Sequence, residues 1–102
     1  MTSVQITRRQ PGIAQVTMNR PKVFNAFDET MIAELDAVFA QLTDASDVRL
    51  IVLASDGNHF STGADLKWMQ RASKATQEAN VADARRFAAM LARIGNCPKP
   101  TI

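Results

Sequence analysis

The sequence is poor in the residues that build disulfide frameworks, metal sites and membrane spans. Its 102 residues include one cysteine, Cys97, and one histidine, His59. It therefore offers neither an internal disulfide nor the several Cys or His ligands of a zinc centre. No apolar run approaches the roughly 20 residues of a membrane span, and the first residues lack the charged-then-apolar pattern of a signal peptide. A lone thiol suits a reducing compartment, so we expect a cytoplasmic protein without a metal.

The net charge is also small. A net charge of +2 is too small to indicate nucleic acid or an anionic membrane surface as the main partner. With 46% hydrophobic and 22% charged residues, the chain has the composition of a globular protein. Its length suits one small domain.

The first twenty residues predict a hairpin. Residues 4–7 alternate apolar and polar side chains, as a half-buried strand does. A turn signal follows at residues 10–12. Residues 13–18 then predict a second strand, whose apolar face consists of Ala14, Val16 and Met18. Strands this close pair most simply as a hairpin.

The next segment predicts a strand–helix–strand unit. After a loop over residues 19–27, Asp28 is the expected N-cap of a helix of about four turns. The helix has one apolar stripe and ends at residues 44–47; the stripe consists of Met31, Ile32, Leu35, Val38, Phe39 and Leu42. Residues 50–54 are apolar on both faces, so we expect a parallel strand with helices covering both sides of its sheet.

The last third predicts two more helices. Residues 64–71 favour a short helix, residues 73–77 are polar without periodicity, and residues 78–94 favour a long helix that stops at Gly95 and Asn96. We expect its apolar stripe to consist of Ala84, Phe87, Ala88, Leu91 and Ile94. Residues 97–102 resemble a connector leading into a strand. We therefore hypothesise that the chain is the N-terminal portion of a longer protein.

One stretch has an arrangement suited to chemistry. The strand at residues 50–53 is followed by turn-forming residues, then by Gly63 and a helix start. This order places unpaired backbone N–H groups, and the positive end of a helix, at the mouth of a sheet. Such a site can hold an oxygen that becomes anionic during a reaction. On spacing alone, however, Gly63 is more often an ordinary loop glycine.

Two segments resemble signatures of the enoyl-CoA hydratase/isomerase (crotonase) superfamily. These are residues 60–66, Phe-Ser-Thr-Gly-Ala-Asp-Leu, and residues 18–27, Met-Asn-Arg-Pro-Lys-Val-Phe-Asn-Ala-Phe. They lie in the usual order, with one predicted helix and one predicted strand between them. The resemblance implies an α/β fold, the crotonase-like fold of ββα repeats, with residues 1–102 as the N-terminal part of one domain.

The resemblance also implies a function and a site. It implies an enoyl-CoA hydratase that adds water across the 2,3-double bond of an acyl-CoA thioester, with no cofactor because coenzyme A is part of the substrate. Gly63 and the Ala64 backbone N–H match one half of the oxyanion hole. The predicted CoA-binding residues are Arg20, Lys22, Ala64, Asp65, Leu66 and Lys67. Each Lys or Arg taken singly is more often a solvated surface charge, and for Asp65 we prefer a structural, helix-stabilising role over that of a base.

Several alternatives stay open. In the family both catalytic glutamates lie C-terminal to this stretch and match none of Glu29, Glu34 and Glu78, so we expect the segment alone to be inactive. The residues that select the reaction also lie mostly outside it, so an enoyl-CoA isomerase or another crotonase is the alternative. Residues 63–70 and 80–85 are similar to methylglutaconyl-CoA hydratases. Trp68 and Met69 could line an acyl pocket or pack the core. The family forms trimers or pairs of trimers, and a scaffold role would act through assembly. A non-catalytic RNA-binding role would use a basic face, interrupted by acidic residues, made of Lys67, Arg71, Lys74, Arg85, Arg86 and Arg93.

Overall fold

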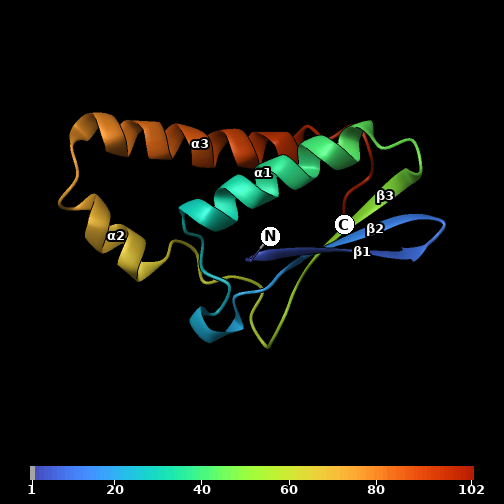
Figure 1. Ribbon diagram of the computed structural model, residues 1–102, viewed down its shortest axis with the longest axis horizontal. Coiled ribbons are helices and arrows are strands. Elements are labelled where there is room, and N and C mark those ends of the chain that lie inside the picture. Colours follow the sequence, from blue (N-terminus) through green and yellow to red (C-terminus); the bar gives the residue numbers. More distant parts are fainter. Residues whose placement is uncertain (1) are drawn as a thin grey trace.

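The computed structural model describes residues 2–102 and has a three-stranded sheet with helices beside it (Figure 1). Its elements in chain order are β1 (Val4–Gln10), β2 (Gly12–Met18), the 3-10 helix η1 (Pro21–Val23), α1 (Glu29–Asp44), β3 (Val48–Ser55), α2 (Leu66–Ala72) and α3 (Gln77–Gly95). Every helix and strand predicted from the sequence is present, and most extend a residue or more beyond the predicted bounds.

The sheet is mixed, in the order β1-β2-β3. β1 and β2 are antiparallel, with Val4 opposite Met18, which confirms the predicted hairpin. β2 and β3 are parallel, with Met18 opposite Ser55, as expected for strands joined through α1. The chain then returns beside β3 near its end, where the Ile51 N–H donates to Pro100 at 2.9 Å and the Ile102 N–H donates to Ile51 at 3.0 Å. This pairing agrees with a connector that leads into a strand.

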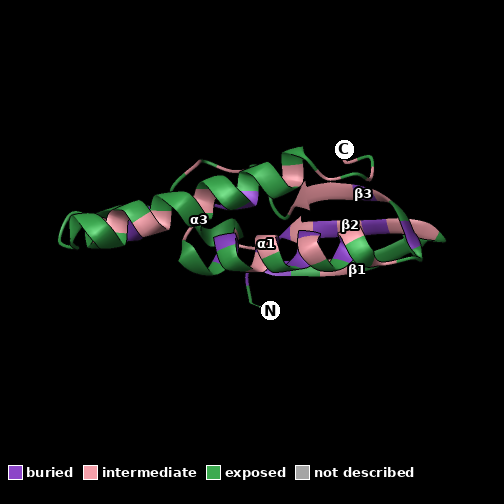
Figure 2. Cartoon of the chain, turned by 90° about the horizontal axis from the view of Figure 1, so that it is seen from above, coloured by how far each residue is buried: buried purple, intermediate pink, exposed green. Residues whose placement is uncertain are grey.

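The core lies between the sheet and α1, and α3 runs alongside α1 (Figures 1 and 2). The predicted faces of β2 and α1 are confirmed as buried; this core comprises Ala14, Val16, Met18, Met31, Ile32, Leu35, Val38, Phe39 and Leu42. The expectation that helices cover both faces of the sheet is wrong for the described residues. Leu50 and Val52 face away from α1 and are only half-buried, while their neighbour Ile51 is fully buried.

The apolar stripe predicted for α3 is wrong in part. Met90 is buried, and Phe87 and Ile94 pack against the core, but Ala84 and Ala88 are exposed and Leu91 is 52% exposed. The inward face keeps Phe87 and Ile94 from the predicted stripe and has Met90 in place of Leu91. Alanines lie on several sides of this helix, so its hydrophobic pattern does not define a single stripe.

The helix starts depend on side-chain caps. The Asp28 carboxylate accepts from the Met31 amide at 2.9 Å, which confirms the predicted N-cap of α1. Thr76 caps α3 in the same way, accepting from the Ala79 amide at 3.1 Å, inside a segment whose sequence lacks periodicity. None of the helices in residues 2–102 combines the length and the hydrophobicity needed to cross a bilayer.

Candidate functional site

Two loops that carry the sequence motifs, residues 19–28 and 56–65, lie against each other through Asn25. This side chain is fully buried. Its amide nitrogen donates to the carbonyl oxygens of Asp56 and His59 at 2.7 and 2.8 Å, and its oxygen accepts from the Arg20 amide at 2.8 Å. Asn25 therefore fastens the second loop to the first. It stands inside one of the quoted motifs, but the sequence gives no separate signal for this role.

The two loops then form a short parallel bridge between Phe27 and Ala64. The Phe27 N–H donates to Gly63 O at 2.7 Å, and the Asp65 N–H donates to Phe27 O at 2.7 Å. These bonds use the groups on both sides of Ala64, so the N–H of Ala64 itself points away from Phe27. Within residues 2–102, no protein atom accepts a hydrogen bond from this amide. A free, fixed donor thus lies where the sequence predicts one.

Gly63 has a backbone conformation that suits this turn. Its φ is +96°, in the region that L-residues rarely adopt, and a Cβ placed on it would meet no atom within 4 Å. The requirement for glycine is therefore conformational rather than steric. The Gly63 N–H is held by the Ser61 hydroxyl at 3.2 Å, and that hydroxyl donates to Asn25 O at 2.8 Å.

Arg20 occupies the centre of the two loops instead of standing free. Its Nη2 lies 3.1 Å from Asp65 Oδ2 and 3.3 Å from Asp28 Oδ2, and its Nη1 donates to Ala26 O at 2.5 Å. The side chain is 19% exposed. The structure therefore gives Arg20 an internal role that competes with the predicted contact to CoA phosphates, which stays a prediction.

Asp65 is the N-cap of α2, which begins at Leu66, two residues later than predicted. Its Oδ1 accepts from the Trp68 amide at 3.0 Å. Burial raises the pKa of Asp65, but hydrogen bonds from the Trp68 amide and from Arg20 outweigh it and hold the pKa below its ordinary value. Asp65 is thus a charged structural group, as the preferred interpretation of the sequence states.

A pocket of about 270 Å³ opens beside Ala64. It lies between α2 and α3 and is mostly apolar; its lining residues are Ala64, Trp68, Met69, Ala72, Asn80, Asp83, Ala84 and Phe87. The rings of Trp68 and Phe87 lie 5.9 Å apart. Trp68 is also 9% exposed and belongs to the core, so this residue both packs the helix and lines the pocket.

Sequence reasoning missed the polar members of this pocket. Asn80 and Asp83 come from α3; they stand in the quoted segment 80–85, but nothing in that segment assigns them to a pocket. Trp68 Nε1 and Asn80 Oδ1 are the two buried side-chain atoms of the described residues that lack a hydrogen-bond partner. Native proteins leave few such groups unpaired, and here both belong to residues around one pocket.

The remaining predicted CoA-binding residues lie outside this pocket. Lys22 stands on η1 and Lys67 in the first turn of α2; both are exposed. Leu66 is 74% exposed. None of these three lines the pocket beside Ala64, so their contacts with coenzyme A stay predictions.

None of the three glutamates of the chain lines the described pocket. Glu34 accepts from the amides of Ser3 and Val4 at 3.1 and 3.3 Å. Glu29 pairs with Arg71, and Glu78 is exposed on α3. Asp83, the one acidic residue among the lining residues, is paired with Arg86 at 2.5 Å. The described pocket therefore offers a free backbone donor but no unpaired carboxylate.

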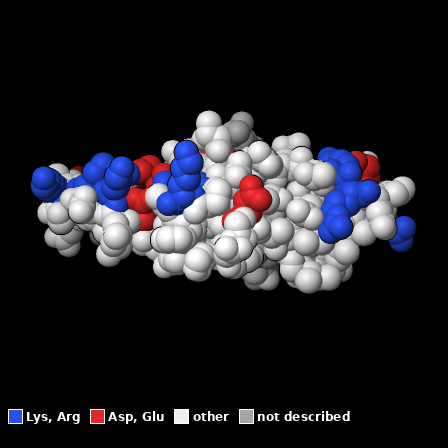
Figure 3. Space-filling model, turned by 90° about the horizontal axis from the view of Figure 1, so that it is seen from below, with Lys and Arg blue, Asp and Glu red and all other residues white. Residues whose placement is uncertain are grey.

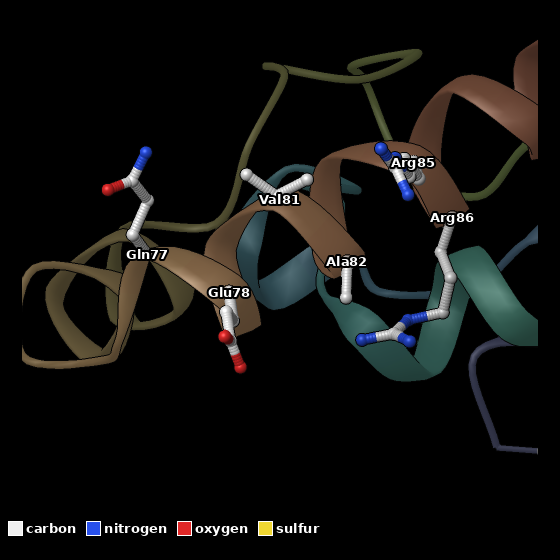
Figure 4. Close-up of a pocket in the computed structure, with 6 residues that line it drawn as sticks. All are labelled: Gln77, Glu78, Val81, Ala82, Arg85 and Arg86. Carbon is white, nitrogen blue, oxygen red and sulfur yellow. The ribbon is translucent and has the colours of Figure 1, made fainter.

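Other features of the described residues carry no comparable site. The largest hollow, about 580 Å³, is lined by α3 alone, including Glu78, Val81 and Arg85 (Figure 4), so it would contact a ligand from one side only. No group of three His, Cys, Asp or Glu residues in 2–102 could hold a metal ion. His59 is exposed and contacts Phe24 edge to face.

Comparison with known proteins decides the family. A sequence model described as enoyl-CoA hydratase/isomerase matches residues 8–102. The chain belongs to the enoyl-CoA hydratase/isomerase family. The family fold agrees with the structure: an enoyl-CoA hydratase from Shewanella pealeana superposes with a TM-score of 0.92 at 35% identity, over 97% of this chain and 37% of that one. The predicted α/β, crotonase-like fold is therefore confirmed.

Curated relatives within the enoyl-CoA hydratase/isomerase family differ in their reactions. The mitochondrial Delta(3,5)-Delta(2,4)-dienoyl-CoA isomerase of Mus musculus is 31% identical over 98% of this chain and 33% of its own length. A probable enoyl-CoA hydratase, echA12, of Mycobacterium bovis is 38% identical over 63% of this chain and 22% of its own length. The chain thus spans about a third or less of the relatives it matches.

Proposed function

We propose that the protein carrying this chain is an enoyl-CoA hydratase, and that the Ala64 N–H is one of two donors that bind the thioester oxygen. The observation that carries this proposal is the position of that amide: it is free of internal partners, fixed by the Phe27 bridge and adjacent to a largely apolar pocket. An apolar pocket suits an acyl chain, and a fixed donor at its edge suits the carbonyl next to that chain.

The chemistry explains why a fixed donor matters. A base removes a proton from water, the water oxygen bonds to C3 of the enoyl group, and the electron pair of the double bond moves to form an enolate on the thioester oxygen. An acid then returns a proton to C2, which restores the thioester. Negative charge gathers on the oxygen only along this path, so a donor already aimed at it lowers the barrier. We expect the acid and the base from elsewhere in the complete protein.

Two finer alternatives remain within the same site. The dienoyl-CoA isomerase relative favours a double-bond shift as the second candidate, because an isomerase also forms an enolate and needs the same oxygen-binding donor. The unpaired Trp68 N–H favours an acyl group that carries a hydrogen-bond acceptor, such as the carboxylate of methylglutaconyl-CoA. The unpaired Asn80 oxygen needs a donor and does not add to this argument. We propose crotonyl-CoA, methylglutaconyl-CoA and a 3-enoyl-CoA as the substrates to compare.

An RNA-binding role receives less support from the charges. Three of the six residues of the predicted basic face are paired with carboxylates: Arg71 with Glu29, Arg86 with Asp83, and Arg93 with Asp36. Figure 3 shows Lys and Arg gathered toward the two ends of one face, with acidic side chains among and between them. Binding that follows phosphates needs an uninterrupted basic surface.

The proposed function can be tested on the complete gene product by removing the donor. Ala64→Pro deletes the amide hydrogen without breaking a hydrogen bond within residues 2–102. Incorporation of lactic acid at position 64 replaces the same amide with an ester and also makes the Gly63 carbonyl a weaker acceptor for the Phe27 N–H. Either change should lower kcat for hydration by about 100-fold or more. Ala64→Gly keeps the N–H and is the matched control, expected within a few-fold of wild type.

The outcomes separate the possibilities clearly. Hydration by the wild type and its loss in the ester variant support the proposal. Conversion of the 3-enoyl-CoA without addition of water would replace hydratase by isomerase. An ester variant with unchanged turnover would refute the role of Ala64.

A further inference from the structure

The guanidinium of Arg20 holds both sides of the Phe27–Ala64 bridge. It bonds to Ala26 O and to the Asp28 carboxylate, the residues that flank Phe27, and to the carboxylate of Asp65, which follows Ala64. One planar cation thus contacts the two backbone segments at the point where they meet. Because the guanidinium fork has fixed donor directions, these contacts define how the segments lie relative to each other.

The same cation joins two helix starts. Asp28 uses Oδ1 to cap α1 and Oδ2 to bind Arg20. Asp65 uses Oδ1 to cap α2 and Oδ2 to bind Arg20. Each carboxylate therefore has one oxygen committed to a helix and one to the arginine. Without the cation, two carboxylates would face each other in a partly buried space, and like charges would push the two segments apart.

We propose that Arg20 is a positioning residue that aims the Ala64 N–H at the thioester oxygen. The proposal rests on the proposed function and goes beyond it, because Arg20 touches neither the reacting atoms nor the pocket lining. Donors act on a developing oxyanion only within a narrow range of distance and angle, and a misplacement of about 1 Å can reduce the rate by about 100-fold. Bonds to three residues around the bridge provide that accuracy.

If Arg20 instead contacts the phosphates of coenzyme A, substitutions of Arg20 should have different kinetic effects. An arginine that binds the phosphates of coenzyme A contributes affinity, so its loss would raise KM and leave kcat largely unchanged. A lysine could replace it as a point charge. With a substrate that lacks these phosphates, such as crotonyl-pantetheine, the effect of the substitution would vanish.

The experiment compares Arg20→Met and Arg20→Lys with wild type in the complete gene product. The control is Arg8→Met, which removes an arginine paired with Asp47 at the distant hairpin, where both side chains are largely exposed. Hydration is measured with crotonyl-CoA and with crotonyl-pantetheine. Binding is measured with butyryl-CoA labelled with ¹³C at the thioester carbonyl, whose infrared stretching frequency reports hydrogen bonding to that oxygen.

Positioning predicts that Arg20→Met lowers kcat by about 10- to 100-fold with both substrates, while the dissociation constant of butyryl-CoA changes less than threefold. The carbonyl frequency of bound butyryl-CoA should move toward its value in water. Arg20→Lys keeps the charge but not the fork, so it should fold and lose about tenfold in kcat. Arg8→Met should match wild type in every measurement.

Two results would overturn the proposal. One is an Arg20→Lys variant with wild-type kcat and wild-type carbonyl frequency, a result that stands even if Arg20→Met fails to fold. The other is a loss confined to KM for crotonyl-CoA and absent with crotonyl-pantetheine. Failure of the proposed function is a separate outcome, because it appears as an inactive wild type or as an ester variant at position 64 that keeps full activity.

Discussion

A single buried carboxylate, Asp65, links the start of α2 to Arg20, and its charge should be visible in the pH dependence of stability. Burial raises its pKa, but the bonds from Trp68 and Arg20 hold the folded-state pKa below the ordinary value of 3.8. Its stabilising effect is therefore complete above pH 3.8 and is lost as the pH falls through the lower, folded-state pKa. At neutral pH, Asp65→Asn should reduce the free energy of unfolding by about 2 kcal/mol.

Urea denaturation of both proteins from pH 7 downward checks this expectation. The gap between wild type and Asp65→Asn should stay constant to about pH 4 and narrow below it. Asp47→Asn is the matched control, since Asp47 pairs with Arg8 on the surface and should cost less than about 1 kcal/mol. A gap that does not change with pH would mean that the charge of Asp65 contributes nothing beyond its shape.

At the scale of elements, the loop that follows β2 and the loop that follows β3 depend on Asn25. Asn25→Ala leaves the carbonyl oxygen of Asp56 without its donor, and that of His59 with only the Ser55 hydroxyl at 3.2 Å. It also places alanine at a φ of +56°, a left-handed conformation that asparagine tolerates better. Together these losses should reduce the free energy of unfolding by about 3 kcal/mol, and the displaced loop should lower turnover as well.

The control for Asn25 is available in the other loop. Asn58 is exposed, and Asn58→Ala should change stability by no more than about 0.5 kcal/mol. Chemical denaturation of the two variants gives both values. A loss of less than 1 kcal/mol in Asn25→Ala would show that the loops are held by their backbone bonds instead.

The sequence predicts those elements whose signal is local. The alternation of Ala14, Val16 and Met18 and the cap at Asp28 each depend on a few neighbouring residues, and both agree with the structure. The inward face of α3 depends on which of several alanine-lined sides meets α1, and that choice is made by packing. The same reason explains why Leu50 and Val52 are only half-buried. Apolar side chains on both faces of a strand do not reveal which face a helix of the same chain will cover.

The same distinction between local and long-range signals applies to the candidate site. Gly63 and Ala64 follow from a motif and a strand–glycine–helix order, and the structure places the amide beside a pocket. The family resemblance predicts Arg20 as a phosphate ligand, and no local pattern reveals its internal partner Asp65, which lies 45 positions away in the sequence. Asn80 and Asp83 reach the pocket only because α3 folds back over α2. Long-range pairing of this kind leaves no periodic or compositional trace.

At the scale of the whole molecule, the proposed function assigns the described residues only half of a catalytic arrangement. It gives them one donor for the thioester oxygen and one wall of an acyl pocket, while several of their carboxylates serve as caps or ion-pair partners. Acid–base catalysis needs a group within hydrogen-bond reach of the reacting water and carbon, with its proton free to move. A carboxylate whose oxygens are already held by an arginine or an amide is not free to reach the reacting atoms and exchange a proton with them.

The isolated 102-residue chain should therefore fail to hydrate crotonyl-CoA, even when circular dichroism shows that its helices are formed. Its rate should equal that of buffer, and the complete gene product under the same conditions should turn over the substrate. The pocket is open on one side and lined by only two helices and Ala64, so the isolated chain should also bind butyryl-CoA weakly. Turnover by the isolated chain clearly above the buffer rate would contradict this prediction, because residues 1–102 would then have to contain both a base and an acid. Asp83 would be the first residue to substitute in the search for them.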